Sequence, residues 1–236
     1  MFKHQTRLFA LLIVTLHLGG CALLDELPGD MRTQGDDESR VAAALREALI
    51  IGSERASDRA GQIDGYLANS LIRIALPTDI QRTASRLRAL GMGRQVDELE
   101  VAMNRAAEAA ATEAVAVFRN VVANMRPADV YAVLNGGEDA ATAYLRQHSE
   151  DVLRQRYQPI VSHHLAQVRA TELYADLARR YNQLPLVTPI TVDLDDHVTR
   201  RALDGLFVLL AEEEQRIRTD PIARTTQLLR DVFGRG

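Results

Sequence analysis

The longest helical pattern of the chain is GRQVDELEVAMNRAAEAAATEAVAVFRNVVANM, which runs from Gly93 to Met125. Apolar residues recur in it at the spacing of one helix face. The first part of that face consists of Val96, Leu99, Met103, Ala106 and Ala110. The many small alanines allow neighbouring helices to approach closely. A helix that is apolar nearly all round is a buried one, so we expect this segment to form the centre of the core, with a bend near Thr112.

The segments on both sides of this pattern are helical as well, with little loop between them. The predicted helices cover residues 38–60, 78–90, 127–135, 138–157, 171–183 and 195–218, followed by a last helix that begins at Asp220-Pro221. Pro159 should bend or interrupt the chain. Asp195 or Asp196 should cap the start of the helix predicted at 195–218. Two stretches alternate instead, IRIAL at 72–76 and ITVDL at 190–194, and could pair as one short ribbon. The sequence therefore predicts an all-α fold, a single globular multi-helix domain over residues 38–236 with at most that two-stranded ribbon.

The amino terminus has the layout of a secretory signal peptide over residues 1–20. Basic Lys3 and Arg7 precede the uncharged run LFALLIVTLHL at 8–18, and Gly19 and Gly20 close the segment. Eleven helical residues span about 16 Å, whereas a bilayer core is about 30 Å thick. The run is therefore too short to be a good permanent membrane span.

The motif Leu18-Gly19-Gly20-Cys21 resembles the lipobox of bacterial lipoproteins. The resemblance implies that the Cys21 thiol is diacylglycerylated, that the signal is cut before it and that the new amine is acylated. Cys21 is the only cysteine, so no disulfide can form within the chain. Ala22 follows it in place of Asp, which by the same resemblance implies sorting to the outer membrane. Residues 21–37 then read as a lipidated cysteine and a flexible tether. The alternative is an ordinary secreted protein with a stray thiol.

Composition excludes several classes of function. Hydrophobic residues make up 47% and charged residues 25%, which are ordinary globular values. The formal net charge of −4 becomes two units more negative without Lys3 and Arg7, which argues against nucleic-acid binding. Lys3 is the only lysine, so a mature chain has no phosphate-loop lysine and no lysine Schiff base. We expect no cofactor and no metal.

Two polar groups are candidates for a site. Asn104, Arg105 and Glu108 fall within one turn, with Asn104 and Glu108 on the same helix face. The position of this turn beside the alanines predicts that it faces the interior, where its charges must be paired. Asp195 and Asp196 could bind a hard cation, but helix capping explains them without any ion.

Two further charged motifs have simpler explanations. The adjacent residues His163 and His164 lie about 100° apart on a helix, so they do not share a face as metal ligands would. The stretch AEEEQRIR at 211–218 is expected to form a solvated helix face on which glutamates pair with arginines, such as Glu212 and Glu214 with Arg216 and Arg218.

Four segments together resemble the bacterial family catalogued as domain of unknown function 4197. They are VDELEVAMNRAAEAA at 96–110, LNGGEDAATAY at 134–144, LDGLFVLLAEEEQRIR at 203–218 and DPIARTTQLLRDVFG at 220–234. The resemblance implies an exported or lipid-anchored protein, in agreement with Cys21, and it carries no catalytic residue. Thr112 stands where the family often has proline, and His197 stands where tyrosine is usual.

These observations favour a lipid-anchored helical domain that faces the periplasm from the outer membrane. Its role is expected to be binding or envelope support without catalysis, and its partners are the membrane, through the anchor, and an envelope protein or a small apolar ligand. Two alternatives stay open: a hydrolase-type enzyme with an Asp, Glu, Arg and His site between helices, and a carrier of an apolar ligand.

The lipidation of Cys21 can be tested directly. Cys21→Ser should abolish labelling by radioactive fatty acid and move the protein from the membrane to the soluble fraction, because more than one acyl chain is needed for stable anchoring. Labelling followed by fractionation measures both effects. A variant that still sediments with membranes and carries label would contradict the prediction.

Overall fold

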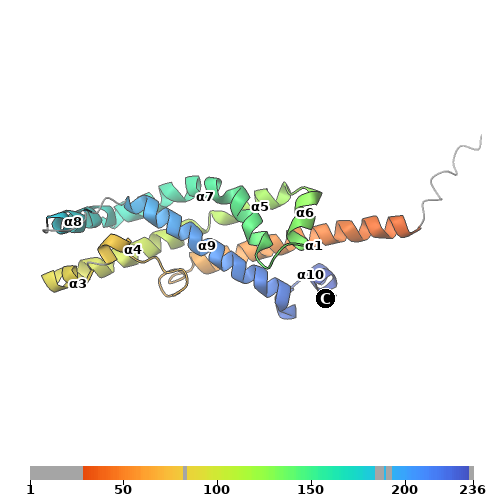
Figure 1. Cartoon of the computed structure of the whole chain (residues 1–236), viewed down its shortest axis with the longest axis horizontal. Coiled ribbons are helices and arrows are strands. Elements are labelled where there is room, and N and C mark those ends of the chain that lie inside the picture. The colour runs from red at the N-terminus through yellow and green to blue at the C-terminus, as the bar shows by residue number, and fades with distance from the viewer. Residues whose placement is uncertain (1–28, 82–83, 184–188, 190–192, 234–236) are drawn as a thin grey trace, which may run out of the picture. The chain divides into compact units, whose positions relative to one another are not determined.

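The computed structural model describes residues 29–81, 84–183, 189 and 193–233, which are mostly helical and contain no strand (Figure 1). The all-α prediction is therefore confirmed. The chain divides into two units, Met1–Glu38 and Ser39–Gly236. Cys21 and the predicted signal peptide lie outside the described residues. Among the residues that are described, no helix is long and apolar enough to cross a membrane.

Most predicted helices form close to their predicted bounds. The elements are α1 Gly29–Gly61, α2 Thr78–Gln81, α3 Ala84–Leu87, the π-helical turn η1 Arg88–Met92, α4 Gly93–Ala111, α5 Ala114–Ala123, α6 Pro127–Leu134, α7 Ala140–Gln167, α8 Ala170–Asn182, α9 Leu194–Thr219, the 3-10 turn η2 Pro221–Ala223 and α10 Gln227–Phe233. Helix α1 begins before residue 38, so part of the segment predicted as a tether is helical.

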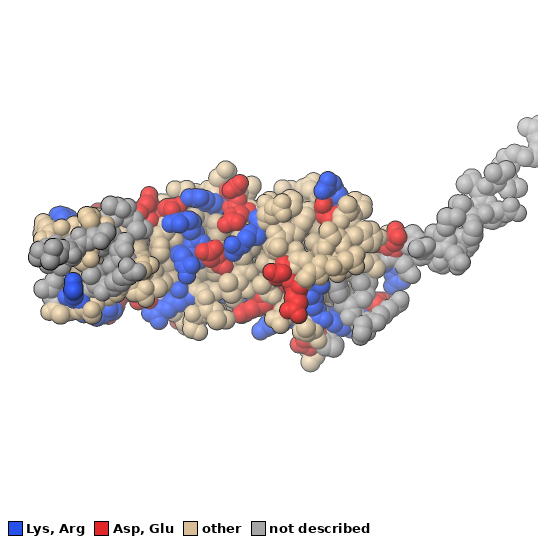
Figure 2. All heavy atoms as spheres, in the orientation of Figure 1, with Lys and Arg blue, Asp and Glu red and all other residues tan. Residues whose placement is uncertain are grey.

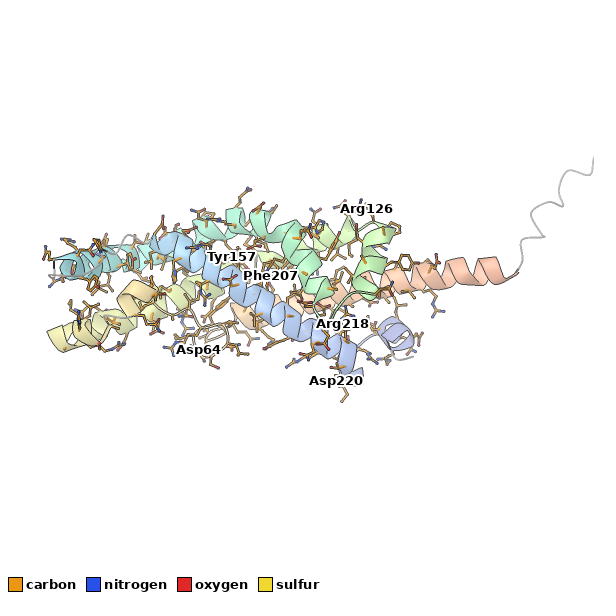
Figure 3. All side chains as sticks on the ribbon, in the orientation of Figure 1. Asp64, Arg126, Tyr157, Phe207, Arg218 and Asp220 are labelled. Atoms are coloured by element: carbon orange, nitrogen blue, oxygen red, sulfur yellow. The ribbon has the colours of Figure 1, made fainter. Side chains whose placement is uncertain are left out.

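The core lies between α4, α7 and α9, which pack against one another within the unit Ser39–Gly236. The predicted apolar stripe of α4 is completely buried in it. This stripe consists of Val96, Leu99, Met103, Ala106 and Ala110, all 0% exposed. On the neighbouring helices, Tyr157 of α7 and Phe207 of α9 fill the space next to it (Figure 3). Packing of aromatic rings against alanines keeps the three helix axes close.

The bend predicted near Thr112 is present as the break between α4 and α5. The last carbonyl groups of a helix have no partner inside the helix. Here the Ala111 carbonyl accepts hydrogen bonds from Ser57 Oγ at 2.6 Å and from Tyr157 Oη at 3.3 Å. Side chains of α1 and α7 therefore stabilise the end of α4 in the interior, and no proline is needed there.

Pro159 was predicted to bend or interrupt its helix, and the predicted interruption is wrong. Helix α7 continues through it to Gln167. A proline removes one backbone hydrogen bond, to the carbonyl four residues earlier. That residue is Gln155, which is exposed like Pro159 itself, so water can satisfy the free carbonyl. The buried face of α7 compensates for the local cost.

Three smaller predictions also need correction. Residues 72–76 form no strand, and Leu194 already belongs to α9; residues 190–192 of the expected ribbon lie outside the described part. The cap of α9 is Asp193, whose side chain accepts from the Asp196 backbone N, because the helix begins one residue earlier than predicted. The last helix is split into η2 and α10.

Replacing glycine by alanine should change the free energy of unfolding in opposite directions at Gly52 and at Gly205. Gly52 lies inside α1 and borders a small cavity of about 30 Å³. A Cβ there would meet Ile217 Cδ1 at 3.7 Å, which is ordinary contact. Gly52→Ala should therefore raise the free energy of unfolding by about 0.5–1 kcal/mol, because alanine orders a helix at lower entropic cost.

At Gly205 of α9, a Cβ would meet Tyr66 Cε1 at 2.7 Å and Ile72 Cβ at 3.0 Å. Gly205→Ala should therefore lower the free energy of unfolding by about 1–3 kcal/mol through overpacking. Urea unfolding followed by circular dichroism measures both variants. Equal effects of the two substitutions would contradict the packing described here.

Candidate functional site

The polar turn of α4 faces the loop that joins α1 to α2, residues 62–77. Asn104 is fully buried. Its Oδ1 accepts a hydrogen bond from the Ile74 backbone N at 2.8 Å, and its Nδ2 donates to the Ile74 carbonyl at 2.9 Å. The same Nδ2 donates to the Glu100 carbonyl at 2.8 Å. One amide side chain thus pairs with both backbone polar groups of Ile74, as a neighbouring strand would.

Glu108 holds the first half of the same loop. It is 4% exposed, and its Oε1 accepts from the backbone N of Tyr66 at 3.2 Å and of Leu67 at 3.3 Å. Its Oε2 accepts from Arg105 Nη1 at 2.6 Å, and Arg105 Nη2 donates to Asp64 Oδ1 at 2.7 Å. Hydrogen bonds to Glu108 and Asp64 raise the pKa of the Arg105 guanidinium. Figure 3 labels Asp64 on this loop, beyond the end of α1.

Asn104, Arg105 and Glu108, which we call the α4 clamp, fasten the loop from one side, and α9 fastens it from the other. Tyr66 Oη donates to the Ala202 carbonyl at 2.6 Å. Burial, together with the nearby Glu108, raises the pKa of the Tyr66 hydroxyl, so it stays a neutral donor.

His197 of α9 makes a second contact with this loop. His197 Nε2 lies 3.2 Å from the Ala75 carbonyl, and burial lowers the pKa of its imidazole. The side chains that hold the loop therefore have partners within the chain itself.

The second predicted group does not join the α4 clamp. Asp196 lies between α7 and α9, where its Oδ1 is 2.5 Å from Arg154 Nη2 and its Oδ2 is 2.9 Å from Arg200 Nε. Asp195 Oδ1 is buried without a hydrogen-bond partner among the described residues. The structure thus places Asp195 and Asp196 at the start of α9, and of the two it is Asp196 that pairs with arginines.

The two arginines that pair with Asp196, Arg154 and Arg200, line a charged cleft of about 310 Å³ between α7 and α9. A second aspartate, Asp204, lies 3.6 Å from both Arg146 and Arg201. Charges of both signs alternate over this part of the surface (Figure 2). In the described ranges, no three His, Cys, Asp or Glu side chains gather in a way that could hold a metal ion. The cleft therefore links two helices through ion pairs.

Two buried carboxylates were missed by the sequence analysis, which expected a solvated face at 211–218. Glu214 accepts hydrogen bonds from the backbone N of Ala141 at 3.0 Å and of Thr142 at 2.8 Å, and it is paired with Arg218 at 2.8 Å. It therefore caps the N-terminus of α7 from another helix, where a negative charge is favourable. Arg218 lies near the end of α9 (Figure 3).

The other missed carboxylate, Glu213, is 1% exposed and bonds Arg59 of α1 at 2.9 Å. Glu212 also pairs with Arg59, in place of the expected Arg216. The signal that could have identified these residues is the position of Glu213 and Glu214 on the helix. Each continues the apolar face that contains Leu206, Leu209 and Leu210, three or four residues after a buried leucine.

A large open groove of about 880 Å³ lies between α4 and the end of α7 with α8. We call it the α4–α8 groove. Its apolar lining consists of Val101, Ala102, Ala106, Val168, Ala170 and Leu173. Its polar lining consists of Arg88, Arg94, Asp97, Glu98, Arg105 and His164. Val101 is 42% and Val168 61% exposed, so apolar surface in this groove is open to solvent.

Comparison with known proteins decides the family. A family model described as protein of unknown function (DUF4197) matches residues 36–234. The chain belongs to the DUF4197 family. The resemblance that the four sequence segments suggested is thereby confirmed. No curated protein and no solved structure matches this DUF4197 chain.

The α4 clamp gives a stability prediction for this DUF4197 protein. Glu108→Ala should lower the free energy of unfolding by about 1–3 kcal/mol, because it leaves the backbone N–H groups of Tyr66 and Leu67 without their acceptor, while Arg105 keeps Asp64. Glu98→Ala is the matched control on the same helix. Its i,i+4 pair with Arg94 is exposed, so its loss should cost under about 1 kcal/mol. Urea unfolding measures both, and similar small effects would show that the clamp is a solvated face.

Proposed function

We propose that this protein is a lipid-anchored module of the bacterial envelope that faces the periplasm and binds an apolar ligand in the α4–α8 groove. The volume and the lining of this groove are the observations that support the proposal. Ligand sites are typically concave, mostly apolar and of about 300–1,000 Å³, with a few polar groups. A groove of about 880 Å³ with six apolar lining residues and a charged rim fits that description.

The polar residues favour binding over hydrolysis. A hydrolase needs carboxylate, imidazole or guanidinium groups that can reach a substrate. In the α4 clamp, the Asn104 amide makes three hydrogen bonds to the backbone, and Glu108 accepts three more from backbone and Arg105. Asp196 is engaged by Arg154 and Arg200. Asn104, Glu108 and Asp196 are thus engaged within the fold, whereas the α4–α8 groove offers open apolar surface.

The proposed location rests on the amino terminus. The lipobox-like LGGC at 18–21 supports an acylated Cys21, and Ala22 supports sorting to the outer membrane. An anchored module with an apolar groove can hold a lipid-like molecule, or an apolar part of an envelope protein, next to the membrane. An envelope-support role would need the anchor and the fold but no open groove.

The groove can be tested with the uncharged fluorescent probe N-phenyl-1-naphthylamine. The chain from Ala22 to Gly236 carries no lipid and retains the compact unit Ser39–Gly236. Its titration should give a fluorescence increase that saturates at one probe per chain. Val101→Glu should weaken probe binding at least about tenfold, because an ionised carboxylate on the apolar floor is costly to bury.

Val152→Glu is the matched control. Val152 of α7 is 45% exposed, almost as much as Val101, but it does not line the groove. It should bind the probe like the unchanged chain. If the unchanged chain binds no probe, or if both variants lose binding equally, the proposed binding function is wrong.

A further inference from the structure

The relative register of α4 and α7 places one histidine in the α4–α8 groove. The two helices pack against each other and run in opposite directions (Figure 1). The hydrogen bond from Tyr157 Oη to the Ala111 carbonyl shows that Tyr157 of α7 and Ala111 of α4 lie at about the same height along the helix pair. Seven residues further along α7 is His164, and seven residues back along α4 is Asn104. His164 therefore lies about level with Arg105, and both residues line the groove.

Val101 and Val168 follow in the same register, so these two exposed valines line the groove about one turn further along. Beyond them lie Asp97 and Glu98, which pair with Arg88 and Arg94. The groove thus has an inner end with Arg105 and His164, an apolar middle and an outer end with balanced ion pairs.

The inner end carries basic groups and no carboxylate in its lining. Glu108 and Asp64 use two of the five N–H donors of the Arg105 guanidinium. Neither of these acids lines the groove. The His164 side chain is half-buried, and its ring lies 6.0 Å from the His163 ring, measured between centroids, at an interplanar angle of 84°. Within the described part of the chain, the His164 imidazole has no hydrogen-bond partner.

We propose that the α4–α8 groove binds a long-chain carboxylate, with its chain along Val101, Val168 and Leu173 and its carboxylate at His164 and Arg105. This inference rests on the proposed function and adds the chemical class of the ligand. The lining from Arg105 to Arg94 extends about 16 Å along α4, which suits a medium to long acyl chain. One imidazole and one guanidinium match the two oxygens of a carboxylate.

The experiment measures displacement of N-phenyl-1-naphthylamine from the Ala22–Gly236 chain. The competitors are laurate, dodecylamine and lauroyl lysophosphatidate, which share an alkyl length but differ in the head group. Laurate should displace the probe at a concentration about tenfold lower than dodecylamine, because a hydrogen bond to a charged group contributes that much to affinity. Laurate should also displace the probe at a lower concentration than lauroyl lysophosphatidate.

His164→Ala should remove the preference for laurate, by about tenfold, and leave the affinity for the uncharged probe and the circular dichroism melt unchanged. His163→Ala is the matched control, because the neighbouring ring is exposed and does not line the groove; it should keep the preference.

If the probe binds but laurate and dodecylamine compete equally, the inference about the carboxylate is wrong while the binding function stands. Tighter binding of lysophosphatidate, or the same loss in His163→Ala, would also overturn it. Absence of probe binding in the unchanged chain would overturn the proposed function itself.

Discussion

The pairing of the Asn104 side chain with the backbone of Ile74 is the contact on which the rest of the site region depends. A loop buried between two helices must satisfy its N–H and C=O groups without a neighbouring strand. Asn104 supplies both a donor and an acceptor to Ile74, and Glu108 accepts two more N–H groups of the same loop. The loop can then pack so closely on α9 that only glycine fits at Gly205.

The same solution occurs a second time at the start of α7. Glu214 of α9 accepts the free N–H groups of Ala141 and Thr142, and Arg218 balances its charge. In both places a buried carboxylate binds the backbone of a different segment and is paired with an arginine on its own helix. Arginine suits this role because its planar, permanently charged fork can bind several acceptors at once. These two ion pairs therefore hold separate elements of the fold together.

The charged cleft and the α4–α8 groove differ in how far their polar side chains are already paired within the chain. Asp196 and Asp204 join α7 to α9 through arginines, so the arginines of the charged cleft are engaged in ion pairs. The α4–α8 groove differs, because exposed valines line it and the His164 imidazole has no hydrogen-bond partner among the described residues. The ligand binding that we propose for this family member rests on that difference between the groove and the cleft.

The sequence by itself determined the helical fold, the buried stripe of α4 and the break at Thr112, because these depend on local periodicity and on the exclusion of apolar side chains from water. It also indicated that Asn104 and Glu108 face the interior, since alanines surround them on the helix. It could not identify their partners, which lie 30 to 42 residues away along the chain. Only the tertiary structure decided that Glu213 and Glu214 are buried, that α7 continues through Pro159 and that His164, but not His163, lines a groove. Each of these features depends on which helices pack together and in what register. The pattern of apolar residues along one helix does not contain that information.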